Sequence, residues 1–156
     1  MSPSEVLNAA ADARDNAALL GADRAEIPRG QSAWVVREWW EGLTADQRQA
    51  YLTAYPSEIG ALNGIPAIAR DHANRTRLDQ YIAQMQANAD ALYGTPGGPI
   101  YDESYEPARK LHSKLEDRNL YLLGFNPDFG HTTRDAPSSP SATPTPPPTY
   151  PRWSPA

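Results

Sequence analysis

The sequence contains no cysteine among its 156 residues. This absence excludes a disulfide-stapled scaffold, a thiolate metal site and a cysteine nucleophile. Long apolar runs are also missing, since none approaches the ~18 residues that a membrane span requires. The first five residues have neither the basic region nor the apolar core of a Sec-type signal peptide. We therefore expect no membrane span and, by default, a cytoplasmic location, with type VII secretion left open.

Basic residues are outnumbered: 14 Lys and Arg stand against 19 Asp and Glu, which gives a formal net charge of −5. No basic stripe is visible along the chain. Because nucleic-acid binding depends on neutralising phosphates with Lys and Arg, nucleic acid is a disfavoured partner. No glycine-rich phosphate loop and no His-Glu-x-x-His motif occurs, so the sequence predicts no cofactor and no metal.

The last part of the chain has the composition of a tail. Half of the sixteen prolines lie in the last twenty residues, among Ser and Thr. Such a segment cannot bury enough apolar surface to fold, so we expect a disordered Pro/Ser/Thr-rich tail over 131–156. Its run 144–148 could serve as a polyproline ligand, although solvated tails are commoner. Trp153 has no assigned role.

The rest of the chain shows helical patterns. Ser2 caps the first helix, Pro3 suits its first position and Glu5 completes a capping box. Helices are expected over about 3–20, 32–41, 45–55, 67–92 and 106–118. The predicted fold class is mainly α: an irregular helical bundle of about five helices, with a helical domain at 1–118, one isolated strand-like segment and the tail.

Aromatic residues identify the expected core. Because aromatic side chains bury large areas, five of them are predicted to form its centre: Trp34, Trp39, Trp40, Tyr51 and Tyr55.

Between the two prolines at 56 and 66, two glycines and an asparagine suggest a tight connection that needs positive φ. The run 120–125 is the one convincing strand pattern, and a single strand cannot form a sheet.

Polar residues interrupt the apolar face of the long helix. Asp71 and Asn74 lie in the middle of this face, with Arg70 and Arg75 at its margins. Because a buried carboxylate or amide is costly unless hydrogen-bonded, we expect both to bind the 60–65 connection, with an Arg balancing the Asp. Replacing either by Ala should lower the melting temperature by several degrees. A catalytic or ligand site is the less favoured interpretation, and His72 points about 100° away from Asp71.

Three runs, 39–49, 55–66 and 70–75, resemble the helical region that precedes the catalytic domain in actinobacterial α/β-hydrolases of the DUF1023 family. The match is dense over 39–78, with Asn63 where the family usually has Asp. The residues that carry it are Trp39, Trp40, Pro56, Gly60, Gly64, Pro66, Arg70, Asp71, Asn74 and Arg75. They form a structural motif, and the resemblance assigns none of them a catalytic, cofactor or metal role.

The resemblance also accounts for the lone strand. It implies that 119–130 is a strand-like remnant of the first strand of the hydrolase sheet. The nucleophile elbow Gly-x-Ser-x-Gly does not follow, and the histidines at 72, 112 and 131 suggest no Ser-His-Asp set. We therefore expect a non-catalytic helical module, structural or partner-binding, that lacks the hydrolase domain.

Two alternative functions stay open. The chain could be a fragment of an ester-type hydrolase that needs a separate catalytic chain. It could also be the trafficking region of a type VII-secreted effector, because Trp40-Glu41-Gly42 resembles the Trp-x-Gly turn of such substrates. If the non-catalytic function is correct, 106–125 should dock on a protein partner or self-associate. Its apolar residues should then be poorly covered: Leu111, Leu115, Leu120, Leu122, Leu123 and Phe125.

Overall fold

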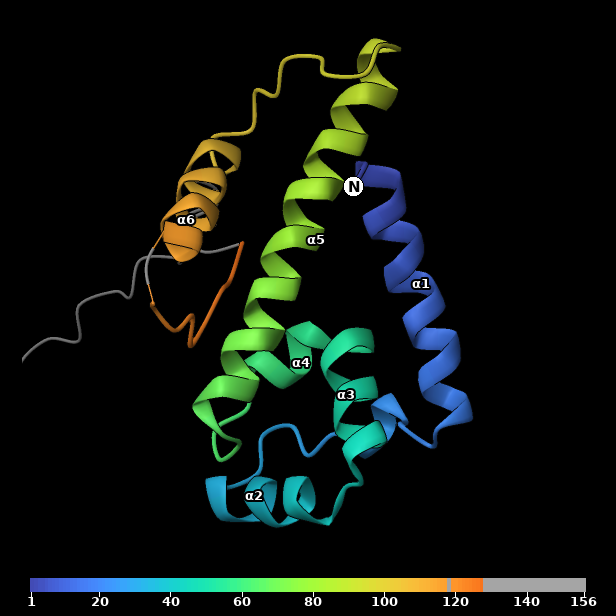
Figure 1. Ribbon diagram of the computed structural model, residues 1–156, viewed down its shortest axis with the longest axis vertical. Helices are drawn as coiled ribbons and strands as arrows, with labels where there is room; N and C mark the ends of the chain where they lie inside the picture. Colours follow the sequence, from blue (N-terminus) through green and yellow to red (C-terminus); the bar gives the residue numbers. More distant parts are fainter. Residues whose placement is uncertain (118, 128–156) are drawn as a thin grey trace, which may run out of the picture.

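The computed structural model describes residues 1–117 and 119–127, and this part of the chain is mainly α-helical (Figure 1). The predicted tail at 131–156 lies outside the described residues. The elements are α1 (Pro3–Leu19), the short 3₁₀ helix η1 (Arg24–Glu26), α2 (Ala33–Gly42), α3 (Ala45–Ala54), α4 (Pro56–Ala61), α5 (Ala67–Tyr93) and α6 (Tyr105–Asp117). The predicted fold class is confirmed, with one helix more than expected. No described helix is long and apolar enough to cross a membrane.

Helix α5 is the axis of the molecule. Its 27 residues span about 40 Å, and it packs against α1, α3, α4 and α6. Helices α1, α3 and α4 pack against α5 and partly against one another, while α6 lies on the opposite side of α5 from α1 (Figure 1). Gly94 ends α5 in the left-handed conformation, with φ of 68°.

The predicted helix starts at Ser2 and Thr44 are confirmed. Each hydroxyl accepts a hydrogen bond from the backbone N–H three residues later, and Glu5 or Gln47 returns a bond to the capping residue. These two capping boxes fix where α1 and α3 begin. Ser32 caps α2 through a bond from Val35 N–H.

The first core cluster surrounds the packed aromatic rings. Tyr51 is fully buried and Trp40 is 6% exposed, while Trp39 and Tyr55 pack partly buried against them. The prediction for Trp34 is wrong, because this side chain is 65% exposed. On α2 the buried positions are Val36 and Trp40, one turn apart, and Trp34 projects from the opposite face.

The sequence predicted a tight connection between Pro56 and Pro66, but the structure forms a short helix in the first part of it. Its first six residues form α4, because Pro56 suits the first position of a helix. Within the connection, only Gly64 has positive φ, at 112°. Gly60 is helical and is needed for space instead, because a Cβ there would overlap Asn74 Oδ1.

Residues 119–127 follow α6, bend back beside α5 (Figure 1) and form no strand ladder. A second core cluster anchors them, in which Leu122 joins Leu78, Ala108 and Leu115. The expectation that the leucines of this region are uncovered is therefore wrong for Leu115 and Leu122. Leu120 and Leu123, by contrast, are 48% and 46% exposed.

Candidate functional site

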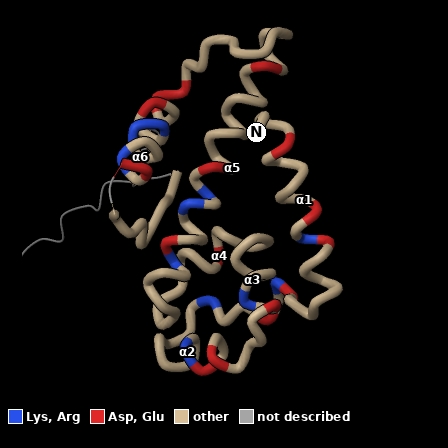
Figure 2. The backbone as a smooth tube through the Cα atoms, viewed as in Figure 1, with Lys and Arg blue, Asp and Glu red and all other residues tan. Residues whose placement is uncertain are grey.

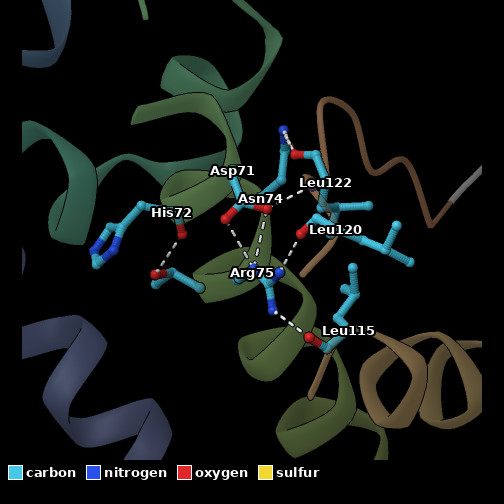
Figure 3. A network of polar contacts seen from close by, with 8 residues as sticks. Asp71, His72, Asn74, Arg75, Leu115, Leu120 and Leu122 are labelled. Atoms are coloured by element: carbon cyan, nitrogen blue, oxygen red, sulfur yellow. Dashed lines mark hydrogen bonds and ion pairs between the residues drawn. The ribbon is translucent and has the colours of Figure 1, made fainter. Parts of the chain in front are cut away.

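The polar residues of α5 converge on one feature, the main chain that follows α6. Figure 3 shows Asp71, Asn74 and Arg75 pointing toward Leu115, Leu120 and Leu122. Two further arginines of the same helix reach the same stretch. We call the five side chains the α5 clamp, and residues 119–125 the extended segment. The α5 clamp consists of Arg70, Asp71, Asn74, Arg75 and Arg77.

Asn74 is the buried centre of the α5 clamp. Its side chain is 1% exposed, and its Nδ2 donates to Gly60 O at 3.3 Å and to Leu122 O at 3.0 Å. The bond to Gly60 confirms the expectation that Asn74 binds the 60–65 connection. Through these two bonds a single amide ties α4 and the extended segment to α5.

Asp71 has different partners from those expected. Its Oδ1 accepts the Leu122 N–H at 2.5 Å, and both of its carboxylate oxygens accept from Arg75 Nε, at 3.0 and 2.9 Å. An arginine thus balances the carboxylate as predicted, but Asp71 does not bind the 60–65 connection. Arg70 makes that contact, since its Nη1 donates to Asn63 Oδ1 at 3.3 Å.

The arginines complete the α5 clamp by donating to main-chain carbonyls. Arg75 donates to Leu115 O at 3.2 Å and to Leu120 O at 2.5 Å. Arg70 Nη2 donates to Leu123 O at 2.7 Å. Arg77 Nη1 donates to Phe125 O, and its guanidinium lies 5.8 Å from the centroid of the Phe125 ring. Charge-assisted bonds of this kind are stronger than bonds between neutral groups.

The α5 clamp therefore supplies hydrogen-bond partners that a neighbouring strand would otherwise provide. Four carbonyls and one N–H of the extended segment are bound by side chains of one helix. The segment is held in a fixed register against α5, because each arginine reaches a different residue. This arrangement orders a chain segment and leaves its outward side chains uncovered.

The geometry offers little for acid–base or metal chemistry. His72 points away from the Asp71–Arg75 pair (Figure 3), which agrees with the predicted angle of about 100° between His72 and Asp71. Within 1–117 and 119–127, no group of three or more His, Asp or Glu side chains is arranged to hold a metal ion. His131 lies outside the described residues.

The other motif residues lie at separate places. Trp39 and Trp40 belong to the first core cluster, where the Trp39 ring meets the Tyr51 ring with centroids 5.0 Å apart. Pro56 begins α4, and Pro66 precedes the first residue of α5. The motif thus combines core, helix-start and clamp positions, and these residues form no single site.

Sequence reasoning missed two polar features. Arg77 was not singled out, although it follows Arg70 by seven residues and so shares its helix face. The second is a link between α5 and α6, in which His112 Nε2 lies 3.1 Å from Asp79 Oδ1 and His112 Nδ1 lies 3.7 Å from Glu116 Oε2. Burial raises the pKa of Asp79, and the nearby His112 opposes this rise.

Comparison with known proteins places the chain among uncharacterized relatives. It is 30% identical to the uncharacterized proteins MT2140 and Rv2079 of two Mycobacterium tuberculosis strains, over 158 aligned positions that cover 81% of the chain. The chain spans only 24% of the length of these curated relatives. It matches no protein-family model and no solved structure.

Proposed function

We propose that the chain is a non-catalytic helical module that holds the extended segment ready for a protein partner. The observation that carries this function is the α5 clamp, which binds five main-chain groups of the segment with side chains of one helix. Ordering a free chain costs roughly 1–2 kcal/mol for each residue fixed. A segment ordered in advance binds a partner without that cost.

The outward face of the extended segment supports docking through 106–125. Leu120, Tyr121 and Leu123 are 48%, 62% and 46% exposed, and they are neighbours along the chain. Adjacent exposed apolar side chains on an ordered backbone are typical of interaction surfaces.

A second candidate function is the helical part of an ester-type α/β-hydrolase whose catalytic domain is a further domain or a separate chain. The length of the relatives favours it, because about three quarters of each lies beyond the matched region. The resemblance to DUF1023 proteins supplies the ester-hydrolase class. In this function the extended segment would be the element that contacts the catalytic domain.

Two measurements, of self-association and of apolar-dye binding, test whether Leu120 and Leu123 form a docking face. We expect the purified chain to self-associate in sedimentation velocity or to bind an apolar dye, and the double variant Leu120→Ser/Leu123→Ser to do neither. The matched control is Leu19→Ser/Ile68→Ser, because these side chains are 85% and 67% exposed and lie elsewhere. A wild-type chain that is strictly monomeric and binds no dye contradicts the proposal.

A short-chain ester assay tests the absence of catalysis. We expect no turnover above buffer and no covalent labelling by a fluorophosphonate probe. Robust turnover, or a single labelled serine, would overturn the non-catalytic function. Turnover that arises only when a second protein carrying Gly-x-Ser-x-Gly is added would favour the second candidate function instead.

A further inference from the structure

A groove of about 1070 Å³ lies on a face of the molecule that the α5 clamp does not use. Helix α5 forms its floor, α1 and α3 form one wall, and α6 forms the other. Figure 1 shows α1 and α6 on opposite sides of α5. The residues of α1 that line the groove run from Pro3 to Leu20, which corresponds to a length of about 25 Å. This length exceeds that of an ordinary small-molecule pocket.

The wall contributed by α1 is apolar and shallow. Val6 and Ala13, seven residues apart on one face of α1, are partly exposed along it, and Ile82 of α5 is partly exposed in the floor. Ala10, Ala17 and Ala83 line the groove from beneath and are buried. Small side chains let two helix axes approach to about 8–10 Å. A helix is therefore the element that this wall is shaped to receive, with its own larger apolar side chains directed inward.

The charges at the groove have one dominant sign. Its lining includes four carboxylates, Asp12, Asp46, Asp79 and Glu116, against two positive groups, the Arg109 guanidinium and the Met1 amine. Figure 2 shows acidic positions on α1 and, together with basic ones, on α6, on either side of α5. His112 lies between Asp79 and Glu116 and can neutralise only part of this charge. An occupant that brings positive charge to both rims is therefore favoured.

We propose that this groove binds a cationic amphipathic helix of a partner protein. The apolar face of the helix packs on Val6, Ala13 and Ile82. Its Lys and Arg side chains reach the carboxylates on the two rims. The proposal does not depend on the docking face of the extended segment, because no residue of that segment lines the groove.

The test uses a fluorescein-labelled synthetic peptide of about 16 residues, with leucines at i, i+3, i+4 and i+7 spacing and lysines at the other positions, so that it is amphipathic as a helix. Fluorescence anisotropy with the full chain should show saturable binding that weakens as salt rises. Asp12→Asn/Glu116→Gln removes one charge from each rim, and each removal should weaken binding about two- to fivefold. Ala13→Phe fills the groove and should abolish binding, with the melting temperature recorded to confirm folding.

The matched control is Glu38→Gln/Glu103→Gln, which removes the same charge at two exposed positions outside the groove. It should bind the peptide as the wild type does. The proposal is overturned if this control weakens binding equally, or if a peptide with glutamate in place of lysine binds as tightly. It is also overturned if Trp153→Ala strengthens binding several-fold, because the C-terminal end of the chain would then be the occupant of the groove. It is overturned as well if the wild type is a dimer that Ala13→Phe dissociates, because a second copy of the chain would then be the occupant.

Discussion

Single residues with several partners hold the α5 side of this protein together. Asn74 is the clearest case, because its buried Nδ2 serves carbonyls from two different elements. A carbonyl that loses its donor inside a protein keeps the cost of leaving water, about 1–3 kcal/mol. The residue is therefore worth more to stability than its own two hydrogen bonds suggest.

We expect Asn74→Ala to lower the free energy of unfolding by about 1–3 kcal/mol, because Gly60 O and Leu122 O are then left without donors. The melting temperature should fall by several degrees, as measured by calorimetry. Gln84→Ala on the exposed face of the same helix is the control and should change stability by less than about 0.5 kcal/mol. Equal melting temperatures for Asn74→Ala and the wild type would contradict the prediction.

The burial of Tyr51 predicts that the free energy of unfolding changes with pH in the alkaline range. Its hydroxyl donates to Asp23 O at 3.0 Å, and burial, followed by the nearby Glu26, raises the pKa of Tyr51 above its usual 10.0. The folded state therefore holds the phenolic proton more tightly than the unfolded state does. This contribution to stability is complete below pH 10 and is lost as the pH rises through the raised pKa.

We expect Tyr51→Phe to be about 1 kcal/mol less stable at pH 7, because Asp23 O loses a donor. The difference from the wild type should shrink or reverse above pH 10, since the variant has no phenol to ionise. Urea unfolding between pH 7 and pH 11 measures both effects. Tyr121→Phe, at a side chain that is 62% exposed, is the control. Parallel pH profiles for the wild type and Tyr51→Phe would show the reasoning to be wrong.

At the residue scale, the sequence predicts the polar side chains of the α5 clamp but not their main-chain partners. Asp71 and Asn74 stood out in the sequence because polar residues interrupted an apolar helical stripe. Their main acceptor and donor, Leu122 O and Leu122 N, could not be found in this way. Main-chain groups are the same at every residue, so the side-chain sequence does not mark which of them will be bound.

At the scale of elements, glycines show how tightly neighbouring segments approach. Gly64 combines φ of 112° with a position at which a Cβ would overlap the Ala33 carbonyl. The connection between α4 and α5 thus touches the start of α2. The sequence indicated a glycine-dependent connection here, but the close approach to Ala33 is tertiary and has no local signal.

We expect Gly64→Ala to destabilise the chain by about 2 kcal/mol or more, from backbone strain and from the overlap together. Gly42→Ala is a matched control, because Gly42 is helical and a Cβ there meets nothing within 4 Å. That change should be neutral or stabilise by up to about 1 kcal/mol. Chemical denaturation of the two variants side by side checks the prediction, which fails if both are equally stable.

The α5 clamp makes a prediction for an amide that belongs to no helix or strand. The Leu122 N–H should exchange slowly with deuterium, because it donates to Asp71 Oδ1 at 2.5 Å. Asp71→Ala should accelerate exchange at Leu122 by at least tenfold and lower the melting temperature by several degrees. Amides of α3 serve as the internal reference and should keep their rates after correction for global stability. Fast exchange at Leu122 in the wild type would contradict the clamp.

At the scale of the whole molecule, two core clusters meet along α5. The first joins residues of α1 to α5, and the second joins Leu78 of α5 to α6 and the extended segment. Polar contacts reinforce the second, since the hydroxyls of Tyr81 and Ser104 are hydrogen-bonded and Gln86 Nε2 donates to Tyr105 OH at 2.9 Å. Helical periodicity predicted the main helices. It could not predict that α5 is the main helix on which α6 packs, because that choice depends on which faces stay unpaired.

This division predicts that the second cluster opens before the first. Leu115 is 7% exposed in the second cluster, and Leu115→Ala should cost about 2–5 kcal/mol. Hydrogen exchange at sub-denaturing urea should then accelerate in α6 and at Leu122 while α3 and α4 stay protected. Ile59→Ala, in the first cluster, should instead accelerate exchange throughout, because its cluster holds most of the helices. If Leu115→Ala accelerated α3 and α6 equally, the two clusters would form one cooperative unit, and the extended segment could not be released from α5 without unfolding the rest.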